Sequence, residues 1–223
     1  MIDNLSPTEE NYIKAIYHLQ KTDDNVSTND VAERLNTKAA SVTDMLKKLN
    51  TKKILNYEKY KGFTLSFEGE KIALAIVRKH RLWEYFLVET LQFGWDEVHA
   101  IAEELEHITS KKLIERLDNF LGNPRFDPHG DPIPDSNGQM EKLVQVNLVD
   151  LPVGQEAKVS AVGSQSTELL ELLTHKSIAI GTNITIKRKF TFDHSMEIET
   201  NGQVAFTISQ QLAQALFVKK TGI

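Results

Sequence analysis

The chain has 223 residues, of which 40% are hydrophobic and 26% are charged, and its formal net charge is −5. This is the composition of an ordinary globular protein of one to two domains. Because there is no cysteine, disulfides, thiolate metal ligands and thiol redox switches are excluded, and any metal must be held by oxygen and imidazole nitrogen. The sequence shows neither a signal-peptide pattern nor an apolar run of about 18 residues, so we expect a cytoplasmic protein without a membrane partner.

The first 72 residues carry three helical patterns followed by a hairpin pattern. Ser6 is suited to cap a helix that begins at Pro7. Two short helices are predicted in "STNDVAERL" and "SVTDMLKKLNTKKI", with "NTKAA" as their connection. The segment "LNYEKYKGFTLS" alternates apolar and polar residues around a turn, as a hairpin does. Two short helices followed by a small hairpin are typical of a winged helix-turn-helix DNA-binding domain.

The local charge of this domain favours contact with DNA. Residues 38–61 hold seven lysines but only two acids, Asp44 and Glu58, which gives a local charge of +5 in an acidic chain. Such a patch suits phosphate contacts, and small side chains early in the second short helix suit thymine methyl groups. The alternative is an ordinary solvated face. The expected DNA contacts are Lys38, Ala39, Ala40, Ser41, Thr43 and Lys47 on the recognition helix, and Lys59 and Lys61 on the hairpin.

From residue 68 to residue 121 the pattern is helical, and its apolar residues cover more than one narrow stripe. Such helices often bury a second face against a partner subunit, so we expect a homodimer. The segment "GNPRFDPHGDPIPDSNGQ" is rich in Pro and Gly and ends the helical part. Strand patterns around one short helix then indicate a small β-barrel-like domain. The predicted fold class is α+β multidomain, with a winged helix domain at 1–72, a helical dimerisation and metal-binding domain at 73–140, a linker at 141–150 and a small barrel at 151–223.

The stretch "HAIAEELEH" concentrates metal-ligand residue types on one predicted helix. Four of its side chains fall within an arc of about 100°, while Glu104 falls outside that arc. These four are His99, Glu103, Glu106 and His107. On the preceding predicted helix, His80 and Glu84 form an i, i+4 pair. The alternative is a set of surface acids and histidines, but two such sets on consecutive helices favour a metal site. Carboxylate and imidazole without sulfur suit Mn²⁺ or Fe²⁺.

A series of motifs resembles the diphtheria toxin repressor and manganese transport regulator (DtxR/MntR) family of metal-dependent repressors. The matching pieces are "TEENYIKAIYHL", "VSTNDVAERL", "AASVTDMLKKL", "KGFTLSFEGEKIA", "VRKHRLWEYFL", "VHAIAEELEH" and "DPHGDPIP", which cover residues 1 to about 135. The remainder, with "LLELLTHKSIAIGTNITI", is similar to the SH3-like (FeoA-type) domain of the longer members. The resemblance implies a homodimer that binds double-stranded operator DNA when metal is bound and represses metal-uptake genes. It implies no enzymatic activity and no small-molecule substrate.

The resemblance also implies two metal ions per subunit. One site would use His80, Glu84 and His99, completed by Gln165 and Glu168 of the SH3-like domain. The second site would use Glu103, Glu106, His107 and Asn11 of the first helix, with Glu10 as the alternative to Asn11.

Two positions decide how the family pattern applies to this chain. Glu103 stands where iron-selective members have Cys and manganese-selective members have Glu, so Mn²⁺ is favoured over Fe²⁺. Short manganese-type members have Asp at the position of Asn11 and Glu at the position of Lys14. Asn can ligate through its amide oxygen, but it supplies no charge.

Three other functions are weighed against a manganese repressor. An Fe²⁺-dependent repressor of the same family is the nearest alternative. A metal-independent winged helix regulator would use the acids in salt bridges on the dimer surface. A carboxylate-bridged di-metal enzyme would need the Glu-x-x-His motif of Glu104 and His107 on two helices, and the sequence has it once.

Overall fold

The computed structural model describes residues 5–21, 26–58 and 62–221. The chain forms two compact units, each built from several segments. The first unit comprises Met1–His80, Glu103–Ile114 and Pro134–Gln139, and the second comprises Arg81–Ala102, Glu115–Ile133 and Met140–Ile223. Three helices contribute residues to both units: α4 (Phe67–Glu89), α5 (Val98–Leu105) and α6 (Lys111–Phe120). Within the described ranges, no helix combines the length and the apolar character needed to cross a bilayer.

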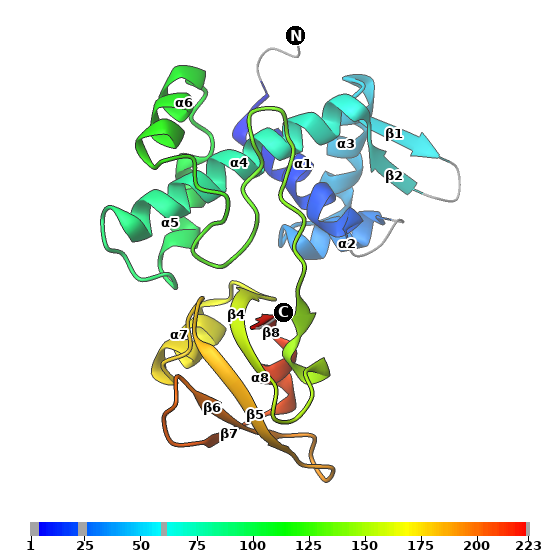
Figure 1. Ribbon diagram of the computed structural model, residues 1–223. Coiled ribbons are helices and arrows are strands. Elements are labelled where there is room, and N and C mark those ends of the chain that lie inside the picture. The colour runs from blue at the N-terminus through cyan, green and yellow to red at the C-terminus, as the bar shows by residue number, and fades with distance from the viewer. Residues whose placement is uncertain (1–4, 22–25, 59–61, 222–223) are drawn as a thin grey trace. The chain divides into compact units, whose positions relative to one another are not determined.

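The first unit contains the predicted winged helix. Its helices α1 (Pro7–Gln20), α2 (Thr28–Arg34) and α3 (Ala39–Thr51) group beside the hairpin of β1 (Leu55–Glu58) and β2 (Gly62–Leu65) (Figure 1). The predicted cap of Ser6 is confirmed, because its hydroxyl accepts a backbone N–H bond in a capping box at α1, and the Ser27 hydroxyl does the same at α2. In the hairpin, Leu55 pairs with Leu65, and Tyr57 pairs with Phe63. The predicted contacts Lys59 and Lys61 lie outside the described residues.

The recognition helix α3 begins at Ala39 rather than at the predicted Ser41. Lys38 is its N-cap residue, with an extended backbone and no side-chain cap, so both alanines join the first turn. One face of α3 buries Val42, Leu46 and Leu49 in the core of the first unit. The other face exposes every predicted contact that α3 and its N-cap carry: Lys38, Ala39, Ala40, Ser41, Thr43 and Lys47.

Helix α5 ends two residues earlier than the predicted helix. It stops at Leu105, and the Ile108 N–H bonds to the Leu105 carbonyl in the turn that follows. Glu106 and His107 therefore lie in this turn and not on the helix, so their directions are set by the side chains that they contact. The turn leads into α6, where the Ser110 hydroxyl accepts from the Leu113 N–H at 3.4 Å.

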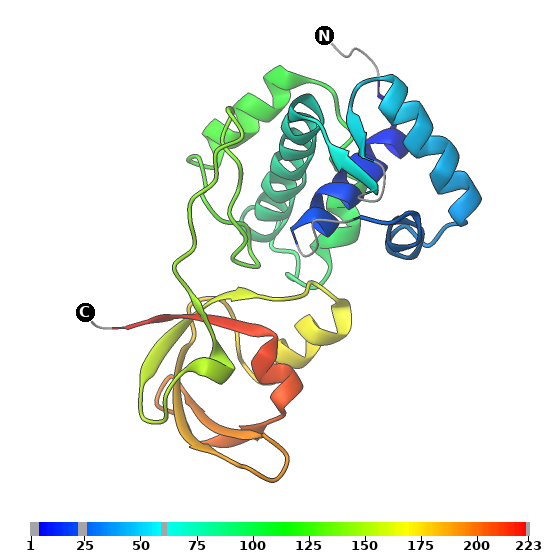
Figure 2. The same ribbon diagram turned by 90° about the vertical axis from the view of Figure 1, so that its right-hand side faces the viewer.

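The second unit contains a six-stranded antiparallel sheet in the order β3-β8-β4-β5-β6-β7. The strands are β3 (Val146–Asn147), β4 (Glu156–Val162), β5 (Asn183–Lys189), β6 (Met196–Thr200), β7 (Phe206–Ile208) and β8 (Leu216–Lys220). A 3-10 turn (Leu148–Asp150), α7 (Thr167–His175) and α8 (Gln210–Gln214) complete the unit, which confirms the predicted barrel-like domain. Figure 2 shows α8 leading into β8, which runs beside β4.

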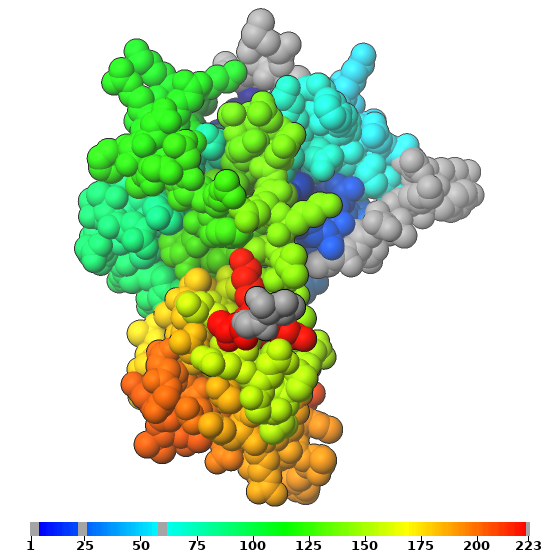
Figure 3. Space-filling view, in the orientation of Figure 1, coloured from blue at the N-terminus to red at the C-terminus, as the bar shows by residue number. Residues whose placement is uncertain are grey.

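Alternation along the strands builds the core of this sheet domain. In β6, for example, Met196, Ile198 and Thr200 are buried while the residues between them are half-buried. Strand β8 buries Leu216 and Val218, and its last two lysines are exposed. The end of β8 lies at the surface in the space-filling view (Figure 3).

Replacing Glu9 by Gln should make the free energy of unfolding depend less on pH in the acid range. Burial alone would raise the pKa of this carboxyl, but hydrogen bonds from Lys52, Ser6 and Lys48 outweigh it and lower the pKa to about 2 from 4.5. Because the pKa is lower in the folded state, the stabilisation is complete above pH 4.5 and is lost as the pH falls toward 2. We expect Glu9→Gln to remove about 2 kcal/mol at pH 7, since its lysine partners are partly exposed. Urea unfolding between pH 2 and 7 measures this, with exposed Glu171→Gln as the control; equal pH slopes in both variants would contradict it.

Candidate metal centre

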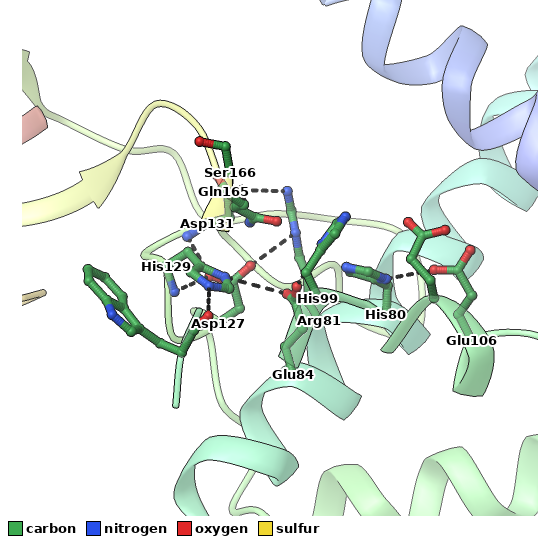
Figure 4. Close-up of polar contacts among 12 residues, drawn as sticks. His80, Arg81, Glu84, His99, Glu106, Asp127, His129, Asp131, Gln165 and Ser166 are labelled. Atoms are coloured by element: carbon green, nitrogen blue, oxygen red, sulfur yellow. Dashed lines mark hydrogen bonds and ion pairs between the residues drawn. The ribbon is translucent and has the colours of Figure 1, made fainter. Parts of the chain in front are cut away.

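Glu84 of α4 lies at the middle of a group of acid and imidazole side chains in the second unit (Figure 4). Its Oε1 is 3.2 Å from Nδ1 of His99 on α5, and its Oε2 is 3.7 Å from Nδ1 of His129. Glu84, Asp127 and His129 are all buried, and their potential ligand atoms lie within 4.8 Å of one another. We call Glu84, His99, Asp127 and His129 the α4 cluster.

A tight loop holds two members of the α4 cluster in place. Asp127 Oδ1 accepts the backbone N–H groups of His129 and Asp131, both at 2.9 Å, so that Oδ1 shapes the loop, while Oδ2 lies 3.4 Å from Arg81 Nε. Gly130 has a φ of +87°, and a Cβ there would lie 2.0 Å from the Ser160 carbonyl oxygen. Only glycine fits this approach to β4. The Val162 N–H also bonds to the His129 carbonyl, which ties the loop to the sheet.

The backbone carbonyl and the indole of Trp95 fix the orientation of the His129 imidazole. Its Nε2 is 2.8 Å from the Trp95 carbonyl, and its ring stacks on the Trp95 indole with centroids 6.0 Å apart. Because a carbonyl can only accept, Nε2 must donate, and this orients the ring so that Nδ1 faces Glu84 Oε2 at 3.7 Å. The indole is fixed in turn by its N–H bond to the Thr174 hydroxyl at 2.9 Å. Such a carbonyl-backed imidazole is typical of a metal ligand.

Negative charge is crowded in the α4 cluster. Burial, together with the carboxylates of Glu84 and Asp131, raises the pKa of Asp127 to about 7 despite the opposing Arg81 and His129. Burial alone would lower the pKa of His129, but Glu84, Asp127 and the Trp95 carbonyl outweigh it and raise that pKa. Both shifts show acids that share too little positive charge. Arg81 is the fixed cation nearby, 3.4 Å from Asp127 Oδ2 and 3.2 Å from Asp131 Oδ2.

The α4 cluster is also suited to a divalent cation because it contains buried polar atoms without hydrogen-bond partners. Over the part of the chain that the structure describes, Asp127 Oδ2 and His129 Nδ1 are buried without a hydrogen-bond partner. A buried polar atom without a partner costs about 1–3 kcal/mol, and a metal ion coordinated by both atoms would remove that cost. Carboxylate oxygen and neutral imidazole nitrogen are suitable ligands for Mn²⁺ and Fe²⁺.

A second group of acids and histidines lies in the first unit, between α1 and the turn after α5. Glu106 is fully buried, and its Oε2 is 2.7 Å from His80 Nδ1. Lys14 of α1 places its Nζ 2.6 Å from Glu103 Oε1 and 2.7 Å from Glu106 Oε1. Burial alone would raise the pKa of Glu106, but His80 and Lys14 outweigh it and lower that pKa. We call Asn11, Lys14, Glu103, Glu106 and His107 the α1 cluster.

The first helix contributes two further polar side chains to this region. His107 Nδ1 is 2.7 Å from Glu10 Oε2, and His107 Nε2 is 3.9 Å from Glu106 Oε1. The Asn11 side-chain oxygen is buried and has no hydrogen-bond partner among residues 5–21, 26–58 and 62–221. An amide oxygen held in this way is suited to a cation, so the α1 cluster also has a donor set that fits a metal.

The positions of the predicted ligands divide between the two clusters. Glu84 and His99 meet as predicted, whereas His80 Nδ1 lies 2.7 Å from Glu106 Oε2. Gln165 donates to Asp131 at 3.3 Å, next to the α4 cluster, and Glu168 is exposed in the first turn of α7. Asp127 and His129 were not among the ligands predicted from the sequence. The signal was available in "DPHGDPIP", where an acid and an imidazole stand two residues apart in a loop constrained by Pro and Gly.

Three protein-family models match consecutive parts of the chain. Residues 4–63 match the iron dependent repressor N-terminal DNA binding domain. Residues 67–135 match the iron dependent repressor metal binding and dimerisation domain. Residues 146–220 match the FeoA domain.

Curated proteins and solved structures agree with these matches over nearly the whole chain. The iron-dependent repressor IdeR of Mycobacterium tuberculosis is 30% identical over 98% of this chain and 100% of its own. A solved manganese-dependent transcriptional repressor in complex with manganese is 31% identical, with a TM-score of 0.85 over 96% of this chain and 100% of its own. The transcriptional regulator MntR of Oceanobacillus iheyensis is 34% identical over 52% of this chain and 78% of its own. Iron and manganese regulators therefore both resemble this chain.

Replacing Asp127 by Asn should stabilise the metal-free protein at pH 8. Since the pKa of Asp127 is raised from 3.8 to about 7, its contribution is most favourable below pH 3.8 and is lost as the pH rises through 7. Asn keeps the Oδ1 acceptor of the loop but carries no charge. We expect a gain of about 1 kcal/mol, or roughly 2–4 °C in melting temperature in EDTA.

Asp135→Asn is the matched control for this variant. Asp135 Oδ1 accepts two backbone N–H groups in the same way, but the side chain is exposed and those bonds lower its pKa. The control should therefore lose stability or remain unchanged. A lower melting temperature for Asp127→Asn at pH 8 would show that the cluster does not crowd negative charge.

Proposed function

This chain belongs to the DtxR/MntR family of metal-dependent transcriptional repressors, and we propose that Mn²⁺ is the ion that it senses. It is a DNA-binding regulator and not an enzyme, and its domains indicate operator DNA and a second copy of the chain as partners. We further propose that the metal-bound form represses metal-uptake genes in the cytoplasm. The division at residues 1–72, 73–140, 141–150 and 151–223 remains our proposal for the domain boundaries.

The donor set carries the assignment to Mn²⁺. Both clusters offer only carboxylate or amide oxygens and imidazole nitrogens, and Glu103 supplies a carboxylate in a chain with no cysteine. Hard oxygen ligands suit Mn²⁺, whereas thiolates would favour softer ions. Fe²⁺ is the alternative, because a relative named as iron-dependent is similar to the whole chain.

We propose two metal ions per subunit. The first would be held in the α4 cluster, by Asp127 and His129 together with the predicted ligands Glu84, His99, Gln165 and Glu168. The predicted ligand His80 lies in the first unit, where its Nδ1 is 2.7 Å from Glu106 Oε2. The second would be held by Glu103, Glu106, His107 and either Asn11 or Glu10. The bound ion would supply the positive charge that lets several carboxylates converge in a buried place. Support comes from the unsatisfied atoms of Asp127, His129 and Asn11.

The α1 cluster connects metal binding to the DNA-binding domain. Helix α1 packs in the same hydrophobic core as the recognition helix α3, through Ile13 and Ile16 against residues such as Leu46. Ligands on α1 and in the turn after α5 therefore fix the winged helix to the segment that follows α5. A metal that binds the docked arrangement more tightly than the undocked one shifts the population toward it. In a dimer, this would set two recognition helices at the spacing of successive major grooves.

The exposed face of α3 supplies the proposed DNA contacts. Lys38 and Lys47 would contact phosphates, Ser41 and Thr43 would reach the bases, and the paired alanines would pack on thymine methyls. The core residues Val42, Leu46 and Leu49 on the opposite face leave this side free of intramolecular packing. Lys59 and Lys61 of the hairpin remain proposed phosphate contacts.

Mn²⁺ should tighten the binding of operator DNA by roughly 5- to 150-fold, which corresponds to a coupling of 1–3 kcal/mol. The probe is a DNA sequence selected from a random library in the presence of Mn²⁺, and gel shifts with Mn²⁺ or EDTA measure its affinity. Anaerobic titrations with Mn²⁺ and Fe²⁺ then decide between the two ions. Glu106→Ala should lose the response, while Glu104→Ala, which alters an exposed neighbouring carboxylate, should keep it. Equal affinities in Mn²⁺ and EDTA would refute metal sensing.

Lys47→Ala should weaken binding to all DNA sequences. The slope of the logarithm of the binding constant against the logarithm of the salt concentration should become less steep by about 1, because one phosphate contact is lost. Its 3.6 Å pair with Asp44 is exposed on both sides and contributes little to folding. Fluorescence anisotropy between 50 and 200 mM salt measures the slope. Lys158→Ala, which removes an exposed lysine from β4, is the control. An unchanged slope for Lys47→Ala would remove this residue from the DNA interface.

A further inference from the structure

Lys14 occupies the place where a cation is needed between Glu103 and Glu106. Its side chain is only 11% exposed, and Nζ lies 2.6 Å from Glu103 Oε1 and 2.7 and 2.8 Å from the two oxygens of Glu106. The ammonium has three donors and no acceptor, and three carboxylate oxygens lie within bonding distance of it. Lys14 therefore contacts the same carboxylate oxygens that the proposed metal site would use.

We propose that Lys14 is a built-in competitor of the metal ion, which sets the Mn²⁺ concentration at which the α1 cluster fills. This inference rests on the proposed function, because it concerns the same site. In the metal-free protein the ammonium neutralises the two carboxylates and keeps α1 attached to the turn after α5. Metal binding then requires the ammonium to leave.

Displacement follows from charge and space. An ion bonded to Glu103 and Glu106 would come close to an ammonium that touches the same oxygens, and two positive charges would repel each other. A buried ion pair is costly to break on one side, because the charge left behind loses its partner. The free energy of metal binding must therefore cover the loss of the Lys14 contacts, and the observed affinity is lower than that of the same ligands without Lys14.

The neighbouring lysines do not share this position. Lys48 and Lys52 pair with Glu9 at 3.3 and 2.6 Å, but their side chains are 55% and 32% exposed. Lys79 lies 3.8 Å from Glu10 Oε1, and Glu10 bonds to His107 rather than to Lys14. Among the described lysines that pair with acids, Lys14 is the one that bridges two of the proposed metal ligands.

The formal charge of the α1 cluster is consistent with a site that fills only at a high Mn²⁺ concentration. With Asn11 as the ligand from α1, the helix adds a neutral oxygen, and the carboxylates of the site are those of Glu103 and Glu106. With Lys14 in place, the formal charge of this group is close to one negative unit before any metal arrives. A divalent ion is therefore attracted less strongly than it would be by two unpaired carboxylates.

The test measures the affinity for Mn²⁺ by calorimetry, with no other ligand present. The protein is the full-length dimer and also carries His129→Ala, which weakens the α4 cluster. In this background we compare the parent protein, which keeps Lys14, with the variants Lys14→Met, Lys14→Gln and Lys14→Arg and with the control Lys48→Met. The control removes the same charge by the same substitution, while Glu9 keeps Lys52 as its partner. Adding Glu106→Ala should abolish the measured binding and so assigns it to the α1 cluster.

We expect Lys14→Met and Lys14→Gln to bind Mn²⁺ at least tenfold more tightly, and Lys14→Arg and Lys48→Met to stay within about twofold of the parent protein. A second readout is the melting temperature. Both neutral variants should melt lower than the parent in EDTA and gain more from the same excess of Mn²⁺, since the stabilisation by a ligand rises with the logarithm of its affinity. A lysine with a merely structural role would lower both melting temperatures and leave the affinity unchanged.

Two results would overturn the inference, and they have different meanings. If the parent and the neutral variants bind Mn²⁺ equally, Lys14 does not compete and the proposed function stands. If no variant binds Mn²⁺ at this site, the proposed metal site fails together with the inference. If one neutral variant does not fold, the other neutral variant decides the outcome.

Discussion

A buried carboxylate must be neutralised or paired, and this constraint organises the region between α1 and the turn after α5. Glu106 is fully buried, and its two oxygens are approached by His80 and Lys14. Removing one partner of such a group strands a charge in a medium of low dielectric, which is far more costly than losing an exposed pair. The attachment of α1, and with it the position of the winged helix within the first unit, therefore depends on which cation accompanies Glu106.

The two clusters meet the same constraint in different ways. In the α1 cluster a side chain of the protein supplies the positive charge, and the pKa of Glu106 is lowered. In the α4 cluster the acids outnumber their partners, the pKa of Asp127 rises to about 7, and buried atoms of Asp127 and His129 have no hydrogen-bond partner within the described residues. A cluster whose carboxylates already contact an ammonium attracts an incoming ion less strongly than one whose acids lack such a partner. This difference in charge would give the two proposed metal sites unequal affinities.

Local patterns predicted the elements of the fold well, because their causes are local. Ser6 and Ser27 cap helices since a hydroxyl at that position satisfies a free N–H whatever the rest of the chain does. The hairpin of β1 and β2 and the buried face of α3 follow from the spacing of apolar residues. The ends of helices were predicted less well. Helix α5 stops at Leu105, because Glu106 and His107 are directed by partners on α1 and α4 that lie far away in the sequence.

The sequence by itself determined the family, the α+β fold class and the kinds of ligand atom, because these follow from motifs, periodicity and the absence of cysteine. It could not determine which ligands face one another. Asp127 and His129 join Glu84 only because Gly130 lets the loop approach β4 and because Trp95 orients the imidazole. Lys14 stood out in the sequence only as an unexpected residue for a metal site. The tertiary structure decided its role, since the partners of a buried charge are set by packing between segments that are about ninety residues apart.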